Sequence, residues 1–506
     1  MLMSVNYLNQ ILNARVYDVA IETPLEFARV LSSRLNNNIF IKREDLQPVF
    51  SFKIRGAYNK LVKLTAKEKT CGVIAASAGN HAQGVALAAK KLGIPATIVM
   101  PQTTPDIKVE AVKNWSPRVI LHGDDYQEAY TKSLEISKKE YLTYIHPFDD
   151  PDVIAGQGTI GMEVLRQCKQ EIDIIFVPVG GGGLISGIAA YVKAIRPNVK
   201  IIGVEPEDAA SMTRSLENNR RVTLEEVGTF TDGCAVRQVG EETFRLTSEL
   251  VDGMITASVD EICAAIKDIF EDTRVIAEPA GALSMAGLKN YAAKNGTVDQ
   301  TLVAINCGAN INFDRLRHIS ERAEIGEKRE SLFAVTIPEK PGSFRQFCTI
   351  LGKISITEFN YRYADETEAK IFVGVKLTGG HIEKSVLMEN FKQGGFQATD
   401  ISDNDIAKLH IRHMVGGRAK DLEDEEVYRF QFPEKPGALL NFLNHLGEQW
   451  NISLFHYRNH GSAFGRVLCG IQVPRAEIEQ FQGFLLKLGY PHWSESENSV
   501  YKTFLR

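Results

Sequence analysis

Three short motifs combine residues that suit one kind of chemistry. Ser51-Phe52-Lys53-Ile54-Arg55-Gly56 places a primary amine in a mostly apolar context, between an extended run at 38–46 and a helix-like run at 57–64. Ser77-Ala78-Gly79-Asn80-His81 and Gly180-Gly181-Gly182-Gly183 each lie between a strand-like and a helix-like segment. A lysine, a polar loop and a glycine run that can cradle a phosphate are together the parts of an enzyme that uses pyridoxal 5′-phosphate.

Each motif alone also has a plainer explanation. Lys53 could be a solvated side chain whose stem lies along apolar surface, and Asn80 could only cap the helix that follows it. The glycine run could be a flexible turn or a tight packing point. It favours phosphate because it follows the almost continuously apolar segment 173–179 and precedes a helix, where backbone N–H groups and the helix dipole attract an anion.

Strand-like and helix-like segments alternate in two sets, at 72–146 and at 158–306. Alternation at this spacing predicts β-α-β units with right-handed crossovers and parallel sheets covered on both faces. The predicted fold class is therefore α/β, with two open parallel-sheet subdomains and a cleft between them. The candidate loops at 77–81, 180–183 and 307–310 all follow strands, which is where open α/β sheets bind ligands.

Beyond this region the chain repeats itself. Residues 320–330 are highly charged and show almost no periodic pattern of apolar residues. We therefore predict a linker there and leave open whether it is helical. Pro338-Glu339-Lys340-Pro341-Gly342 then recurs 95 residues later as Pro433-Glu434-Lys435-Pro436-Gly437. Each copy follows an alternating strand, and the element order fits a β-α-β-β-α-β, ferredoxin-like unit. The predicted boundaries are 1–320 for the α/β domain, 321–330 for the linker, 331–402 and 425–500 for the two repeats, and 403–424 for the connector between them.

Composition excludes several classes of function. The 506 residues are 44% hydrophobic and 24% charged, and the net charge of −5 is not that of a nucleic-acid-binding protein. We expect no membrane contact, because no apolar run approaches the roughly 20 residues that cross a bilayer, and the N-terminus does not resemble a secretory signal. The seven cysteines contain no C-x-x-C pair, which argues against a zinc site or disulfides and indicates a cytoplasmic protein.

The three motifs and Asn306-Cys307-Gly308-Ala309-Asn310 occur in the order typical of the pyridoxal-phosphate β-eliminases related to threonine and serine dehydratases. Residues 1 to about 320 resemble that family, whose fold is the tryptophan-synthase β-like one, fold type II. The paired repeats resemble ACT-like domains, which bind small amino acids in regulated enzymes. With both parts, the whole chain resembles the biosynthetic threonine deaminases, also called threonine ammonia-lyases.

The resemblance implies a role for each site residue. Lys53 would form a Schiff base with the cofactor aldehyde and later act as the general base. Asn80 would bind the 3′-oxygen of the cofactor, while Ser77 and Gly79 would receive the substrate carboxylate. Cys307 would face the pyridine nitrogen as a neutral partner, although a cysteine that acts as a small buried hydrophobe is the plainer explanation. The implied phosphate-binding residues are Gly180, Gly181, Gly182, Gly183 and Leu184.

The implied reaction is the α,β-elimination of L-threonine to 2-oxobutanoate and ammonia, the first committed step of isoleucine biosynthesis, with L-serine as a second substrate. Feedback inhibition by isoleucine, antagonism by valine and a homotetramer are also implied. Tyr361 and Tyr457 occupy equivalent repeat positions and are candidate walls of effector pockets, although packed core aromatics are at least as good an explanation.

Two rival interpretations remain open. A serine dehydratase or racemase on the same scaffold is disfavoured by Ala78, which stands where racemases carry a serine, and by the paired repeats. An amino-acid sensor without catalysis is disfavoured by the intact motifs. We predict no metal site, because Ser211 replaces the aspartate that accompanies Glu205 and Ala209 in metal-binding relatives.

Overall fold

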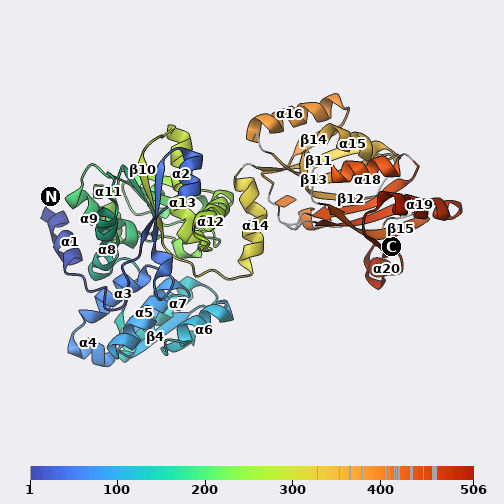
Figure 1. Cartoon of the computed structure of the whole chain (residues 1–506). Coiled ribbons are helices and arrows are strands. Elements are labelled where there is room, and N and C mark those ends of the chain that lie inside the picture. The colour runs from blue at the N-terminus through green and yellow to red at the C-terminus, as the bar shows by residue number, and fades with distance from the viewer. Residues whose placement is uncertain are drawn as a thin grey trace. The chain divides into compact units, whose positions relative to one another are not determined.

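The structure is a computed structural model of the chain and divides into two units, Met1–Ala323 and Glu324–Arg506 (Figure 1). The described residues are all except 1, 328, 353, 364–365, 378–379, 405–406, 409–410, 415, 417–418, 420–421, 434–436, 448, 459–463 and 506.

The larger sheet of the N-terminal unit has six strands, and all neighbours run parallel except the first two. In spatial order the strands are β1 (Leu25–Phe27), β2 (Asn38–Arg43), β10 (Thr301–Asn306), β7 (Ile174–Pro178), β8 (Lys200–Pro206) and β9 (Gly253–Ala257). Every residue of β7 and β10 is buried. Continuous apolar sequence is what a parallel strand covered on both faces requires.

Helices surround this sheet, and side-chain caps start two of them. They are α1 (Leu2–Leu12), α2 (Arg29–Leu35), α8 (Pro151–Gln167), α9 (Gly183–Ile195), α10 (Ser211–Glu217), α11 (Glu241–Leu250), α12 (Val259–Thr273), α13 (Pro279–Asn295) and α14 (Arg315–Gly326). Helix α8 begins before the predicted start at 158, because Asp150 caps it by accepting from two backbone N–H groups and Pro151 fills its first turn. A reciprocal Ser258–Glu261 capping box starts α12.

The smaller sheet has four parallel strands in the order β5 (Arg118–Leu121), β4 (Ala96–Met100), β3 (Val73–Ala76) and β6 (Thr143–Tyr144). Its helices are α3 (Lys53–Val62), α4 (Ala66–Cys71), α5 (Asn80–Leu92), α6 (Asp106–Lys113) and α7 (Tyr126–Glu140). Two parallel sheets flanked by helices confirm the predicted α/β class. The sequence indicated no element between 205 and 261, where the structure has β9, α10 and α11.

The C-terminal unit is one antiparallel sheet of eight strands, in the order β14-β11-β13-β12-β16-β17-β15-β18. The first repeat comprises β11 (Glu330–Pro338), α15 (Ser343–Leu351), β12 (Ser355–Arg362), β13 (Glu368–Lys376), α16 (Gly380–Gln393) and β14 (Gln397–Asp400). The second comprises β15 (Glu425–Pro433), α18 (Ala438–Leu446), β16 (Asn451–Arg458), β17 (Phe464–Gln472), α19 (Ile478–Leu488) and β18 (His492–Ser494). The predicted β-α-β-β-α-β order is confirmed; residues 434–436 of the second Pro-Glu-Lys-Pro-Gly motif lie outside the described residues. Strands β12 and β16 pair and join the repeats.

The internal repeat continues past the last strand of each copy. Ser402 Oγ accepts a hydrogen bond from the Leu332 backbone N–H at 3.0 Å, and Ser496 Oγ accepts one from the Val427 N–H at 2.9 Å. Leu332 and Val427 stand at the same place in β11 and β15. In each repeat, the segment after the last strand is therefore hydrogen-bonded to the first strand of the same repeat through an equivalent serine.

Sequence extends this equivalence, since 402–412 and 496–506 share Ser, Asn, Lys and Arg at four matching positions. In the second copy the segment forms α20 (Ser499–Phe504), whose Tyr501 is buried against Val427 and Leu454. Tyr428, the next residue of β15, and Phe430, on the same face as Tyr428, belong to the other core, beneath α18 and α19. The segment thus covers the second face of the sheet.

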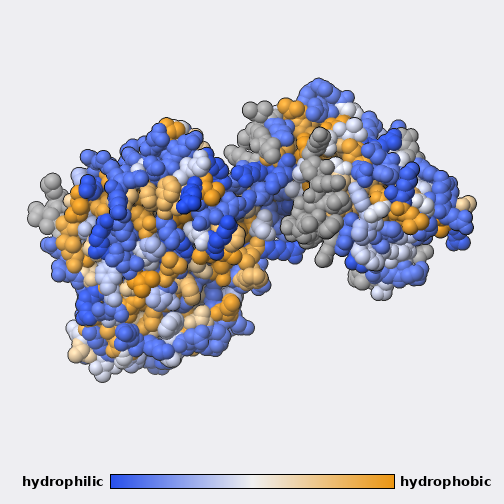
Figure 2. All heavy atoms as spheres, in the orientation of Figure 1, coloured by the Kyte–Doolittle hydropathy of each residue, from blue (hydrophilic) through white to orange (hydrophobic). Residues whose placement is uncertain are grey.

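The visible face of both units is mostly hydrophilic, with apolar residues interspersed (Figure 2). Among the described residues no helix is long and apolar enough to cross a membrane.

Candidate active site

Backbone hydrogen bonds bring Lys53 beside Cys307. The Phe52 N–H donates to the Cys307 carbonyl oxygen at 3.2 Å, and the Ala309 N–H donates to the Phe50 carbonyl oxygen at 2.9 Å. The segment before α3 therefore runs alongside the loop after β10. Two motifs that are more than 250 residues apart in sequence lie together.

The Lys53 amine is held by one hydrogen bond and is partly desolvated. Nζ donates to the Pro147 carbonyl oxygen at 2.8 Å. Burial lowers the pKa of Lys53 to about 8, while the nearby Cys234, Cys307 and Glu278 act in the opposite direction. Such an amine is readily available in its neutral, nucleophilic form.

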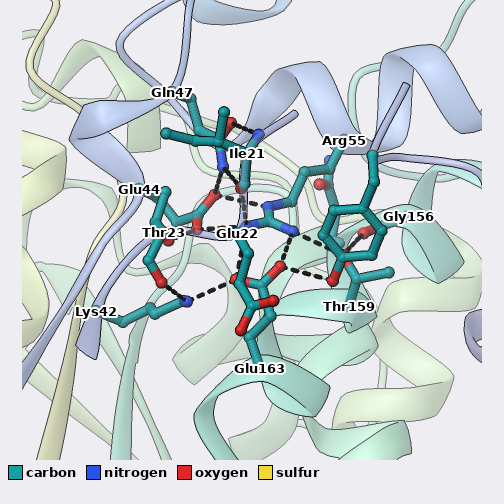
Figure 3. Close-up of polar contacts among 12 residues, drawn as sticks. Ile21, Glu22, Thr23, Lys42, Glu44, Gln47, Arg55, Gly156, Thr159 and Glu163 are labelled. Atoms are coloured by element: carbon teal, nitrogen blue, oxygen red, sulfur yellow. Dashed lines mark hydrogen bonds and ion pairs between the residues drawn. The ribbon is translucent and has the colours of Figure 1, made fainter. Parts of the chain in front are cut away.

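A buried cluster of charges holds the helix that begins at Lys53 (Figure 3). Arg55, two residues further along α3, pairs with Glu44 at 2.7 Å and Glu163 at 2.5 Å, and Lys42 pairs with Glu163 at 2.6 Å. All four side chains are fully buried. Burial would raise the pKa of Glu44, but Arg55 and Lys42 lower it below its ordinary value. The two cations balance the two anions and tie α3 to the end of β2 and to α8.

The glycine run forms a tight turn into α9 that larger residues do not fit. Gly182 caps the helix with a φ of 94°, a conformation that L side chains rarely adopt. A Cβ on Gly181 would lie 2.2 Å from the Phe148 ring, and Thr243 Oγ1 donates to the Gly181 carbonyl oxygen at 2.7 Å. The first N–H groups of α9, including that of the buried Leu184, have no intrahelical partner, so they can bind a phosphate.

The glycine turn and the lysine contact the same short segment. Lys53 Nζ bonds to Pro147, and the ring of the next residue, Phe148, lies against Gly181. Pyridoxal 5′-phosphate has an aldehyde that reacts with an amine and a phosphate that binds a glycine turn. An amine and a glycine turn beside the same segment therefore suit this molecule. Of the residues implied to hold it, Lys53, Gly181 and Cys307 are thus brought to one place.

The polar loop lies at the start of α5. Gly79 caps the helix, and a Cβ added to it would meet no atom within 4 Å, so the loop has an open side. Ser77 Oγ accepts from the Gly79 N–H at 3.2 Å. Asn80 bonds to Asn310, of the loop after β10, at 2.7 Å. The polar loop therefore lies beside the loop after β10, which also carries Cys307, and it is open at Gly79.

Two buried residues near the lysine were missed by sequence reasoning. Glu278 is 4% exposed, and its carboxylate accepts from the Asn80 side chain at 2.6 Å. Cys234 is also buried, and its Cα would lie 2.9 Å from a Cβ on Gly180. A glutamate before Pro279 is typical of an ordinary helix start, so no sequence pattern indicates that it is buried.

The tyrosines singled out in the repeats lie on the two joined strands. Tyr361, on β12, is 3% exposed; its hydroxyl donates to Glu339, and its ring lies 4.9 Å from that of Phe344. Tyr457, on β16, is half-buried and stands opposite Phe359. Both tyrosines pack on the same core, Tyr361 within it and Tyr457 against it, and Tyr457 keeps some exposed surface.

Glu205 serves the start of α10. Its carboxylate accepts from the Met212 N–H at 2.8 Å and from both the N–H and the hydroxyl of Thr213. Within the described part of the chain, no group of three His, Cys, Asp or Glu side chains is arranged to hold a metal ion.

The chain is similar to several known proteins over most of its length. Residues 16–308 match the pyridoxal-phosphate dependent enzymes, and 321–411 and 416–505 match the C-terminal regulatory domain of threonine dehydratase. The chain is 55% identical to "L-threonine dehydratase biosynthetic IlvA" of Burkholderia multivorans, over 99% of both chains, and 53% identical to the Pasteurella multocida protein of that name, over 99% of this chain and 97% of the other. A solved structure of the processed form of threonine deaminase isoform 2 from Solanum lycopersicum is 53% identical, with a TM-score of 0.63, covering 64% of this chain and 89% of that one.

Proposed function

The chain belongs to the family of biosynthetic threonine dehydratases, and on that basis we propose that it converts L-threonine to 2-oxobutanoate and ammonia with pyridoxal 5′-phosphate as its cofactor. The observation that carries the proposal is the meeting of Lys53, the glycine turn and the 77–81 loop. The reaction commits threonine carbon to isoleucine, and the regulatory domain fits feedback control.

Each residue of the site has a distinct task in this proposal. Lys53 anchors the cofactor, Gly180 to Leu184 hold its phosphate, and Asn80 and Cys307 contact its ring. When bound, the cofactor supplies an electron-withdrawing ring that takes up the electron pair left on the substrate α carbon. Burial raises the pKa of the Cys307 thiol well above its ordinary value, so this partner stays neutral.

Lys53 also moves the proton. Because burial lowers its pKa to about 8, a large share of the amine is unprotonated near that pH and accepts the α-proton of the substrate. Loss of this proton and of the β-hydroxyl group removes one water and yields an enamine. The enamine takes up one water as it loses ammonia, so threonine gives 2-oxobutanoate and ammonia with no net gain of water. L-Serine carries the same β-hydroxyl and is proposed as a second substrate.

The substrate carboxylate is assigned to the 77–81 loop. The backbone N–H groups at the start of α5 lack intrahelical partners and face an anion favourably. The open side of Gly79 and the neighbouring Ser77 support this placement.

Regulation is assigned to the C-terminal unit, with isoleucine as inhibitor and valine as its antagonist. Of the two candidate tyrosines, the half-buried Tyr457 suits a pocket wall better than Tyr361, which is packed in the core. A cytoplasmic homotetramer is proposed from the resemblance alone, and light scattering on the purified protein tests the subunit number.

The decisive experiment measures 2-oxobutanoate formation from L-threonine, with and without isoleucine. We expect activity in the wild type, inhibition by isoleucine, and neither activity nor a lysine-linked visible absorbance band in Lys53→Ala. Absence of 2-oxobutanoate from the cofactor-loaded wild type, or a Lys53→Ala protein that keeps the band, would refute the assignment.

A further inference from the structure

The Asn80 amide lies in a chain of hydrogen bonds whose polarity is fixed at both ends. Asn310 Nδ2 donates to the Val49 carbonyl oxygen at 2.7 Å and to Asn80 Oδ1 at 2.7 Å. Asn80 Nδ2 donates to Glu278 Oε1 at 2.6 Å. A carbonyl oxygen and an ionised carboxylate only accept, so rotating either amide end for end would place acceptors face to face.

Glu278 is built into this chain rather than into its own helix. It stands at the N-cap of α13, yet its side chain makes no capping hydrogen bond. Its second carboxylate oxygen accepts from the Asn310 backbone N–H at 3.1 Å. A Cβ on Gly308 would lie 2.5 Å from Glu278 Oε1, so the carboxylate fits here because that residue is glycine.

We propose that Glu278 is a positioning residue for the cofactor ring: it holds the Asn80 amide so that an N–H, and not the carbonyl oxygen, faces the ring oxygen of bound pyridoxal 5′-phosphate. The proposal rests on the proposed function, in which Asn80 contacts that oxygen. One N–H of the Asn80 side-chain amide donates to Glu278. The other N–H of this amide has no hydrogen-bond acceptor among the described residues. A donor at this place favours an ionised ring oxygen, whereas a rotated amide would favour a protonated one.

Protonation of Glu278 weakens this hold, because a neutral carboxyl can also donate. Burial and, less strongly, Asp232 raise the pKa of Glu278, while the Asn80 hydrogen bond and Lys108 lower it, so that the pKa lies at about 7. The other titratable groups coupled to this carboxyl are Lys53, Cys234 and Cys307. We therefore expect the absorbance of the bound cofactor to change with a midpoint near pH 7 in the wild type and to lose this dependence in Glu278→Gln.

A double-mutant cycle tests the proposal. The full chain is stripped of cofactor and titrated with pyridoxal 5′-phosphate while visible absorbance is recorded, for the wild type, Asn80→Ala, Glu278→Gln and the double variant. We expect each single variant to weaken the cofactor Kd by roughly 10-fold or more, as for a lost hydrogen bond to a charged oxygen. The double variant should bind no more weakly than Asn80→Ala, because Glu278 acts through Asn80.

A second variant separates orientation from charge and from misfolding. Asn310→Ala releases the same amide without changing the net charge, and it should alter the Kd and the absorbance band as Glu278→Gln does, including when combined with Asn80→Ala. Independent, multiplying effects in the double variants would overturn the proposal, and so would an unaltered band in Glu278→Gln. An Asn80→Ala protein whose cofactor Kd and absorbance band are unchanged would also overturn the proposal. The proposed function is tested separately, by Lys53→Ala and by the threonine assay.

Discussion

Removing one charge from the buried cluster beneath α3 should cost far more stability than removing the same charge from the surface. In Arg55→Met the two nearby carboxylates lose a guanidinium that binds Glu44 through contacts of 2.7 and 2.8 Å and Glu163 through contacts of 2.5 and 2.9 Å. Of the two buried cations of the cluster, Lys42 then remains to balance both anions. Methionine fills much of the volume, so the change concerns charge more than packing.

The expected cost follows from the complete burial of the cluster. Removal of one partner from a buried ion pair costs about 3–5 kcal/mol, because the opposite charge is left uncompensated. A matched control is Arg15→Met, which breaks an ion pair with Asp18 in which the side chains are 61% and 38% exposed. Exposed pairs contribute at most about 1 kcal/mol.

Urea unfolding of the full chain measures both changes, with the cofactor absorbance as a probe confined to the N-terminal unit. With a slope of about 3 kcal/mol per molar urea, Arg55→Met should lower the midpoint by about 1 M or more, and Arg15→Met by about 0.3 M or less. Equal shifts in the two variants would refute the reasoning.

Three further outcomes are expected. Gly181→Ala should weaken cofactor binding at least roughly 10-fold, because its Cβ would collide with Phe148, whereas Gly483→Ala, where a Cβ meets nothing, should leave titrations with pyridoxal 5′-phosphate unchanged. Burial raises the pKa of Glu205 to about 7, so the folded protein holds this proton more tightly than the unfolded chain. The protonated carboxyl therefore stabilises the fold most below pH 4.5, and this stabilisation is lost as the pH rises through 7. In urea titrations Glu205→Gln should remove up to about 3 kcal/mol of the fall in unfolding free energy between pH 5 and 8. A chain that ends before residue 331 should keep threonine deamination and lose inhibition by isoleucine in the oxo-acid assay, and inhibition that persists would remove the regulatory assignment.

The sequence allowed the backbone of the site to be predicted well. Glycine turns and strand ends carry local signals, since a residue such as Gly182 is needed where φ is positive and a run such as β7 is apolar because both faces are covered. Parallel sheets then place the ends of these strands at one edge, so the loops that follow them meet.

The buried charges could not be predicted in this way. Lys42 and Glu163 are 121 residues apart, and no local period indicates that they pair. Glu278 was missed for the same reason. The charged stretch at 320–330 was predicted as a linker with a helix left open, and residues 320–326 lie in α14. Ile319 and Ala323 of this helix pack in the core of the N-terminal unit.

The pairing of β12 with β16 makes the two repeats a single mechanical body. Five consecutive residue pairs, from Glu358 with Arg458 to Arg362 with Leu454, cross this seam. The hydrogen bonds of a main-chain ladder do not depend on which side chains the strands carry, so this connection between the halves belongs to the backbone. Sequence drift on either half would leave that mechanical link intact.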